Sequence, residues 1–373
     1  MILHDLAPGL KAVQASVQHM PIIMGLMKGT KRMAEMRLGY TDMHTAGEPV
    51  RIVTSGYPTL SGQTILERRR DAKAHYDHFR RAMNFEPRGH AGMYGVIPVP
   101  PSHPEAVIGV LFTHYEGYST MCGHATIAIG RWVIDQGLVP KVEPVTRFAI
   151  EAPCGLLRLA CNVEKGEVTR VIFESVPAFP FARDLVVDVP GHGKIMTDIS
   201  YGGAFYCILP ASRFGLDFFT THTDQLVLAA AALTDTVRAS VKLHHPEAED
   251  LGFLYGTIVT DDANAPDESW NLCVFAEGQI DRSPTGSGVT ARMALDHAKG
   301  QIKPGQTRLF RGISGEPFTG NVKCTLAYAV KDAVTIEVGG QGYYAGEGHF
   351  LIEDKDPLAH GFKLATRFGD VRP

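Results

Sequence analysis

Cysteine is scarce in this chain of 373 residues, which contains six. No two cysteines form a CxxC pair, which excludes a zinc ribbon and a thioredoxin-type redox motif. A secreted domain held together by many disulfides is not indicated either, so we expect a protein of the reducing cytoplasm. The six are Cys122, Cys154, Cys161, Cys207, Cys273 and Cys324.

Long hydrophobic runs and a strong charge imbalance are missing as well. No run of 18 or more uncharged apolar residues occurs, so no membrane-spanning helix is expected. The formal net charge of -4 at pH 7 gives no electrostatic reason to expect nucleic acid or an anionic membrane as a partner. The nucleotide-binding patterns GxxxxGK[ST] and GxGxxG after a strand are also absent.

What is present is the composition of an ordinary soluble globular protein, with 45% hydrophobic and 20% charged residues. The length exceeds the size at which one hydrophobic core stops growing, which favours two domains. Residues 1–32 are mildly basic and apolar, with Asp5 as their single acidic residue. They lack the features of a secretory signal, so we interpret them as a poorly constrained extension.

Short β-rich runs alternate with turn residues in the first half of the chain. One helix is expected there, over residues 122–137, and its nearly continuous apolar positions predict that it is buried. The Pro- and Gly-rich residues 179–193 are interpreted as a connection. The expected strands cover residues 49–53, 96–99, 106–113, 148–152 and 169–173.

The second half repeats this plan. It contains an Ala-rich helix around residues 225–241, a further helix that opens at Thr285, and strands from residue 318 onward. DMHTAGEP and DISYGGAF open the two halves. Cys122 follows His44 by 78 residues, and Thr285 follows Tyr201 by 84. Coincidence could produce this, and so could two homologous halves that bring both helix starts to one cleft.

The two helix starts have the sequences STMCGHAT, at residues 119–126, and DRSPTGSG, at residues 281–288. The first N–H groups of a helix have no internal partner and lie at its positive end, so each start can bind an anion. A substrate carboxylate held by both starts fits better than a phosphate. The alternative is that these are only well-capped helices.

Cys122 is a candidate general base, because a helix N-terminus lowers a thiol pKa toward neutrality. The alternative for any cysteine, a small buried hydrophobe, suits the other five. His124 is a base partner, a metal ligand or a structural histidine. Cys122-Gly-His124 lacks further soft ligands at a matching spacing, so no metal is expected. Asp281 either faces the cleft or caps the second helix.

Six blocks of this chain, taken together, resemble the proline racemase family, which includes hydroxyproline 2-epimerases and trans-3-hydroxyproline dehydratases. One departure is Gly92, where the family commonly carries Asp. The blocks are HTAGEPVR at 44–51, PRGHAGMYG at 87–95, STMCGHATIAIGRW at 119–132, DISYGGAFY at 198–206, DRSPTGSG at 281–288 and the pattern FxxExxDPLxxGF at 350–362.

The resemblance implies a mixed α/β fold like that of diaminopimelate epimerase, with two similar domains whose strands wrap round a central helix. The expected division is an extension at 1–35, a first domain of 36–188 plus 356–373, and a second of 189–355. The resemblance places a substrate carboxylate on the backbone of Gly123, His124, Gly286 and Ser287, and a ring nitrogen between His124 and Asp281. It also implies a homodimer.

Thr285 is the informative departure, because racemases and epimerases of this family have a second cysteine there. A threonine hydroxyl does not ionise usefully near neutral pH, so epimerisation with two bases is not expected. Members with Cys and then Thr look like trans-3-hydroxy-L-proline dehydratases, whose single base here is Cys122. The expected function is therefore cofactor-independent dehydration of this imino acid. Weak racemase or epimerase activity, a cysteine hydrolase and an inactive imino-acid binder are the alternatives.

Overall fold

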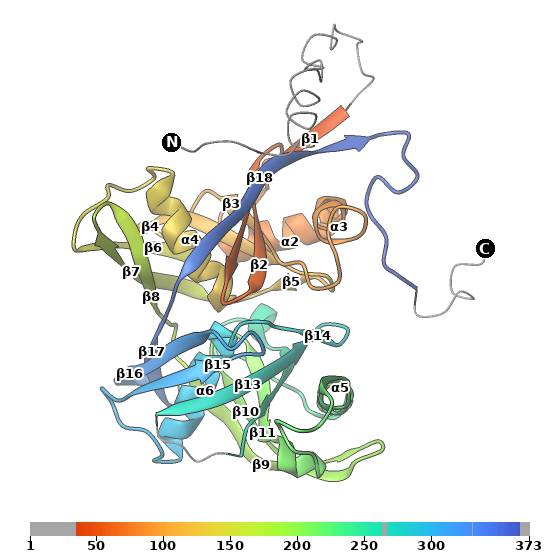
Figure 1. Cartoon of the computed structure of the whole chain (residues 1–373), viewed down its shortest axis with the longest axis vertical. Coiled ribbons are helices and arrows are strands. Elements are labelled where there is room, and N and C mark those ends of the chain that lie inside the picture. The colour runs from red at the N-terminus through yellow and green to blue at the C-terminus, as the bar shows by residue number, and fades with distance from the viewer. Residues whose placement is uncertain (1–34, 263–266, 330, 366–373) are drawn as a thin grey trace, which may run out of the picture.

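Two halves of similar plan stack on each other in the computed structural model, and each wraps strands around one central helix (Figure 1). The structure describes residues 35–262, 267–329 and 331–365. The extension expected at 1–35 lies almost entirely outside these residues. The described helices include none long and apolar enough to cross a membrane.

The first half places α4 (Gly123–Asp135) against the strands that surround it. Its N-cap residue, Cys122, has extended backbone, and Gly137, with a φ of 69°, follows its C-terminus. Eleven helix residues are buried, which confirms the expected burial. The other elements are β1 (Glu35–Thr45), β2 (Glu48–Ser55), α2 (Ile65–His75), α3 (Asp77–Asn84), β3 (Gly95–Val99), β4 (Ala106–Thr113), β5 (Tyr118–Ser119), β6 (Val145–Ala152), β7 (Gly155–Glu164) and β8 (Glu167–Glu174).

The second half is built around α6 (Gly286–Ala298), and α5 (Thr223–Ser240) packs on β12 and β13. Its remaining elements are β9 (Phe179–Val189), β10 (Gly193–Tyr201), β11 (Phe205–Pro210), the 3-10 turns η1 (Ala211–Phe214) and η2 (Glu249–Leu251), β12 (Leu254–Thr260), β13 (Glu268–Phe275), β14 (Gln279–Ile280), β15 (Thr307–Arg311), β16 (Pro317–Tyr328) and β17 (Lys331–Gly340); β18 (Gly342–Glu353) follows.

The same order of pairing runs through both halves. β1 and β2 form an antiparallel hairpin, β2 pairs with β3 in parallel, and β4 pairs in parallel with β6 across the central helix. β10, β11, β12, β13 and β15 repeat this pattern around α6. The pairing shows that the two halves share one plan, which decides between the two explanations that the spacing of the opening motifs left open.

Two crossings join the halves. β8 and β17 pair with each other, and the chain then returns so that β18 pairs with β1 along eleven registered residues (Figure 1). β9 pairs with β10 in the second half. The pairing therefore favours crossing points just after β8 and just after β17, earlier than the expected divisions at 188/189 and 355/356.

The interpretation of residues 179–193 as a connection is wrong. They form β9 and the turn of a hairpin with β10, and buried Val187 and Val189 alternate with exposed positions. Pro180 lies near the start of the strand, where proline is tolerated, so its breaker signal was misleading. α2 was also missed, although Thr64 and Glu67 form a capping box at its start.

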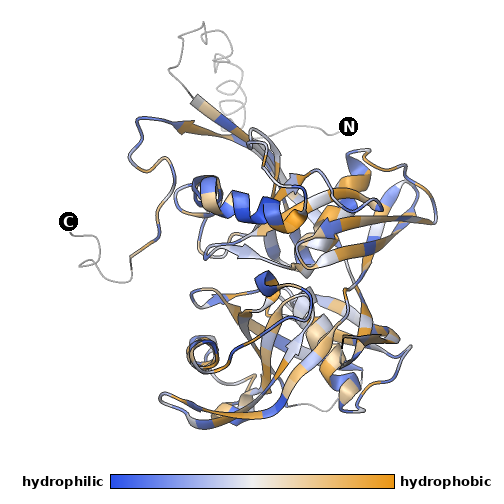
Figure 2. Ribbon diagram, turned by 180° about the vertical axis from the view of Figure 1, so that it is seen from behind, coloured by the Kyte–Doolittle hydropathy of each residue, from blue (hydrophilic) through white to orange (hydrophobic). Residues whose placement is uncertain are grey.

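α2 lies on the outer surface of the first half and covers β4. Figure 2 shows hydrophilic residues along this helix and hydrophobic residues on strands nearby. Its buried Ile65 and Ala72 join a small apolar cluster with residues of β3, β4 and α3. The helix therefore covers this apolar cluster, and its Arg70 also reaches the second half, where Nη1 lies 3.6 Å from the Asp250 carboxylate.

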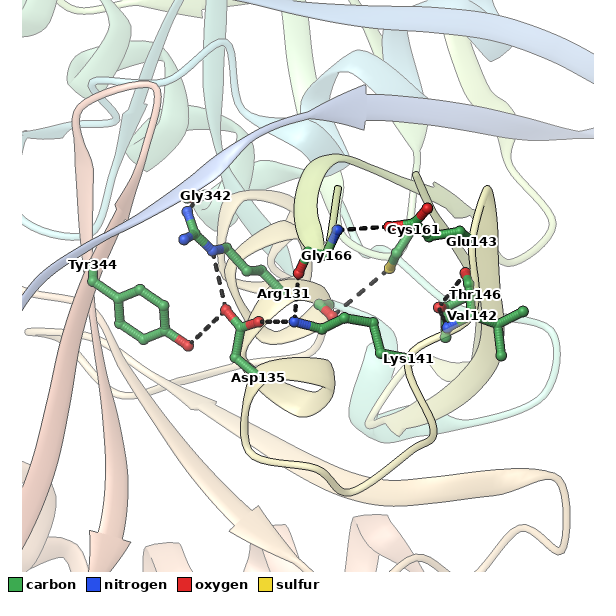
Figure 3. Close-up of polar contacts among 11 residues, drawn as sticks. Arg131, Asp135, Lys141, Val142, Glu143, Thr146, Cys161, Gly166, Gly342 and Tyr344 are labelled. Carbon is green, nitrogen blue, oxygen red and sulfur yellow. Dashed lines mark hydrogen bonds and ion pairs between the residues drawn. The ribbon is translucent and has the colours of Figure 1, made fainter. Parts of the chain in front are cut away.

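The C-terminal end of α4 is anchored to β18 by hydrogen bonds. Tyr344 of β18 donates to Asp135 at 3.2 Å, and Arg131 donates to the carbonyl of Gly342 at 3.0 Å (Figure 3). Lys141 contacts Asp135 as well, at 3.4 Å. These contacts fix α4 relative to β18. They therefore also help to fix the position of the first turn of α4, which begins at Gly123.

Candidate functional site

The first residues of α4 and α6 meet backbone to backbone. A Cβ on Gly123 would lie 2.3 Å from the Cα of Gly286, and a Cβ on Gly286 would lie 2.6 Å from the Cα of Gly123. Only glycine permits this approach. The structure thus confirms that the two helix starts share one site, and both point their free N–H groups and positive ends toward it.

A small cavity of about 10 Å³ lies at this meeting point. It contains every site residue expected from the sequence, from both halves. All of the lining residues are buried, so the site is closed to solvent in this structure. The lining residues are Tyr94, Met121, Cys122, Gly123, His124, Tyr206, Tyr255, Phe275, Asp281, Thr285, Gly286 and Ser287.

Cys122 combines a helix N-cap position with deep burial. Its sulfur accepts from the N–H of Ala125 at 3.4 Å and lies 3.2 Å from Nδ1 of His124. Burial raises the thiol pKa well above its usual value, and the negative charges of Asp281 and Glu48 add to this. The N–H of Ala125 opposes the rise but does not outweigh it. The expected lowering toward neutrality is therefore wrong in this structure.

His124 is buried and uncharged. Desolvation lowers its pKa to about 3, and a hydrogen bond to the backbone at Pro49 opposes the shift. Its own carbonyl accepts from the Thr45 hydroxyl at 2.9 Å, and its ring lies edge to face with Tyr94 at 4.9 Å. The neutral ring can donate or accept one hydrogen bond at each nitrogen, but it supplies no charge.

Asp281 is the titratable group of the cavity whose pKa lies nearest neutrality. Burial raises its pKa to about 6, against hydrogen bonds from Ser283, whose N–H and hydroxyl donate to Oδ1 at 2.8 and 2.7 Å. The carboxyl is thus mostly ionised at pH 7. These bonds also hold it at the cavity rather than at the cap of α6.

Thr285 precedes α6 with a φ of 65°, which is unusual for a β-branched residue. Its hydroxyl is buried without a hydrogen-bond partner of normal geometry, although it lies near enough to Asp281 to oppose the rise in that pKa. Cys273 lies next to this hydroxyl but is not among the residues that line the cavity. Because its thiol lies outside the cavity lining, Cys273 does not replace a second catalytic cysteine; burial also raises its pKa well above normal.

The remaining cysteines were expected to be small buried hydrophobes. Cys161, Cys207 and Cys273 are fully buried, which confirms this for three of the five. Cys154 is half-buried. Cys324 is exposed on β16, where its side chain lies 3.1 Å from the Thr335 hydroxyl, so the expectation was wrong there.

Aromatic residues that the sequence did not single out form much of the cavity wall. Tyr206 hydrogen-bonds Ser287 at 2.7 Å, and Tyr255 stacks on Phe275 with ring centroids 5.3 Å apart. Tyr94 lies in the PRGHAGMYG block and Tyr206 in DISYGGAFY, so the motifs held a signal for these two. Tyr255 and Phe275 come from β12 and β13 and belong to no recognised block.

Gly92, the departure from the family pattern, lies against the guanidinium of Arg282. A Cβ there would lie 2.1 Å from Nη1 of Arg282. Arg282 also donates from its backbone N–H to the buried Glu48 of the first half at 2.7 Å. Glycine at 92 leaves the guanidinium room to contact the Gly92 carbonyl, at 3.3 Å, where an acidic side chain would meet it directly.

Comparisons with known proteins agree on one family. The family model described as proline racemase matches residues 40–363. The trans-L-3-hydroxyproline dehydratase of Xenopus tropicalis is 53% identical over 88% of this chain and 95% of its own length. The trans-3-hydroxy-L-proline dehydratases of Homo sapiens and Colwellia psychrerythraea are 51% and 42% identical, over 88% and 87% of this chain and 94% and 91% of their own lengths.

Solved structures agree on the fold. A probable proline racemase from Agrobacterium radiobacter K84 with bound carbonate has a TM-score of 0.83 at 27% identity, over 88% of this chain and 96% of that one. A hydroxyproline epimerase from Agrobacterium vitis with bound trans-4-hydroxy-L-proline has the same TM-score at 24% identity, over 88% and 95%. These likenesses confirm the expected fold class.

Proposed function

The chain belongs to the proline racemase family, and we propose that it dehydrates trans-3-hydroxy-L-proline to Δ1-pyrroline-2-carboxylate without a cofactor. One observation carries the proposal. The cavity between the helix starts holds one thiol, Cys122, and in place of a second catalytic thiol it holds the hydroxyl of Thr285. The dehydratase names of relatives at 42–53% identity support the same substrate.

We propose that the substrate carboxylate binds the free N–H groups of both helix starts, at Gly123, His124, Gly286 and Ser287. Two positive helix ends suit one anion. The ring ammonium then lies between His124 and Asp281, whose carboxylate balances its charge. This cation also offsets the charges that raise the thiol pKa, so substrate binding favours the Cys122 thiolate.

The stereochemistry of the substrate suits a single base. In trans-3-hydroxy-L-proline the hydroxyl and the carboxylate lie on opposite faces of the ring, so the hydroxyl shares a face with the Cα proton. Cys122 removes this proton as the hydroxyl departs from the same face. The enamine that forms then tautomerises to Δ1-pyrroline-2-carboxylate, and no group on the Thr285 side moves a proton.

Charge that develops on the carboxylate during proton removal is stabilised by amide donors that are already in position. One donor of this kind is worth about 3 kcal/mol in other enzymes. The closed, buried cavity strengthens these interactions. Because every lining residue is buried, the substrate must enter when the two halves move apart along their interface. We expect the enzyme to act in the cytoplasm as a homodimer.

The proposal is tested with purified protein and trans-3-hydroxy-L-proline in deuterated water. A ketimine that reacts with o-aminobenzaldehyde is the expected product. Deuterium at Cα of recovered substrate or epimer without elimination would instead indicate a racemase or epimerase. Turnover of esters or amides would indicate a hydrolase, and binding without turnover an inactive binder.

Thr285→Cys is expected to add epimerase activity. A thiol at this position supplies an acid on the face opposite Cys122, which epimerisation requires. Slow conversion of L-proline or trans-4-hydroxy-L-proline to the D-configured product should appear, measured by chiral chromatography. Thr285→Ser is the matched control and should show none. If Thr285→Cys folds, retains dehydration and still gives no epimer, the facing arrangement proposed for residues 122 and 285 is wrong.

Ligand affinity is expected to fall below about pH 6, because Asp281 has a pKa raised to about 6 and loses its charge as the pH falls through that value. The dissociation constant of L-proline, which carries the ring ammonium, should then rise about tenfold per pH unit. Asp281→Asn should bind more weakly at pH 7 and show no such dependence. Pyrrole-2-carboxylate has no ammonium and serves as the control; titration calorimetry that finds parallel pH dependence for both ligands contradicts the assignment.

A further inference from the structure

Tyr94 places a buried hydroxyl at the cavity. The residue directly precedes β3 and is 2% exposed, and its side chain lines the cavity. Its oxygen has no hydrogen-bond partner of normal geometry. Buried polar groups almost always have a partner, so an unpartnered one at a cavity points to a ligand.

Among the described residues that line the cavity, only two have a buried side-chain oxygen without a hydrogen-bond partner of normal geometry. They are Tyr94 from the first half and Thr285 from the second. Tyr206, by contrast, is bonded to Ser287. Tyr94 comes from the same half as Cys122 and lies close enough to favour its thiolate. The cavity therefore presents a phenol and a thiol together, from one half, and an alcohol from the other half.

We propose that Tyr94 is the acid that protonates the departing 3-hydroxyl, an inference that rests on the proposed dehydration. The Cα–H bond breaks as its proton moves to the Cys122 thiolate, and the electron pair forms the C2–C3 double bond. The C3–O bond breaks, the oxygen takes the phenolic proton of Tyr94, and water leaves. The Cys122 thiol then gives its proton to the Tyr94 phenolate, which restores both groups.

A separate base, Cys122, and acid, Tyr94, suit the geometry of the substrate. The α-proton and the 3-hydroxyl share a face but sit on neighbouring carbons, so two adjacent groups reach both without movement of the sulfur. Burial keeps Tyr94 protonated, because it raises the phenol pKa well above 10. The hydroxyls of Ser119 and Tyr255 oppose that rise, and so would stabilise the transient phenolate.

Tyr94→Phe tests the inference, because it removes one oxygen and keeps the ring that packs on His124. Turnover of trans-3-hydroxy-L-proline should fall by about 10²- to 10⁴-fold, the usual contribution of a general acid. Turnover of trans-3-fluoro-L-proline should fall less than about tenfold, since fluoride leaves without full protonation. Deuterium from solvent should still enter Cα of trans-3-hydroxy-L-proline, which shows that the thiolate remains functional.

Tyr201→Phe is the matched control. Tyr201 is also fully buried with an unpartnered hydroxyl, but it packs on Phe179 and does not line the cavity. This variant should turn over the substrate as the unmodified protein does. Equal losses on both substrates by Tyr94→Phe, loss of Cα exchange, or full activity would each overturn the role of Tyr94. A lack of dehydration by the unmodified protein would instead overturn the proposed function.

Discussion

Cys122→Ser abolishes dehydration of trans-3-hydroxy-L-proline, with an expected loss of at least about 10³-fold in kcat. A serine hydroxyl does not ionise near neutral pH, and no other side chain that lines the cavity on the Cys122 side offers an anionic base. The N–H groups that are proposed to hold the carboxylate belong to the backbone and stay in place. Binding of pyrrole-2-carboxylate should therefore remain within about threefold, measured by titration calorimetry.

Cys324→Ser is the control for this substitution, because Cys324 is exposed on β16 and does not line the cavity. It should leave both turnover and binding unchanged. The two variants together separate the chemistry of one thiol from any general effect of a cysteine-to-serine change. A fully active Cys122→Ser protein refutes the role of this residue as base.

Gly123→Ala is expected to lower kcat/KM by about 10²-fold or more and to weaken binding of pyrrole-2-carboxylate as well. The new Cβ would lie 2.3 Å from the Cα of Gly286, a backbone atom that cannot turn aside. The two helix starts must then separate, and a displacement of about 1 Å is enough to cost about 10²-fold in rate. Loss of binding distinguishes this variant from Cys122→Ser.

Gly346→Ala is the matched control, since nothing lies within 4 Å of a Cβ at that position of β18. Its kinetics and melting temperature should match those of the unmodified protein. A melting curve of Gly123→Ala shows whether the fold survives. Should Gly123→Ala bind pyrrole-2-carboxylate normally, the carboxylate does not lie between the helix starts.

Local patterns were sufficient to predict the elements that carry the chemistry. The apolar run after Cys122 predicted a buried helix, and the structure has α4 at Gly123–Asp135. The glycines at 123 and 286 marked two helix starts, and their contact follows from the shared plan of the halves. The spacing of the opening motifs was compatible with two homologous halves as well as with coincidence, and only the strand pairing decides for a shared plan.

The predictions that were wrong or incomplete concerned properties that depend on a residue's three-dimensional surroundings rather than on its neighbours in sequence. The argument for a low thiol pKa considered only the helix N-terminus, but Cys122 is 3% exposed, and burial dominates. Tyr255 and Phe275 line the cavity because β12 and β13 pair there, and nothing near either residue in the sequence indicates this. The hairpin at residues 179–193 was hidden by its Pro and Gly residues.

The most direct test of a single base on one face compares trans- and cis-3-hydroxy-L-proline by NMR in deuterated water. The Cα proton lies on the same face in both compounds, but the hydroxyl of the cis compound lies on the opposite face. We predict that the trans compound yields Δ1-pyrroline-2-carboxylate, whereas the cis compound only exchanges its Cα proton and keeps its configuration. Elimination from the cis compound at a comparable rate, or inversion at Cα, would contradict the account.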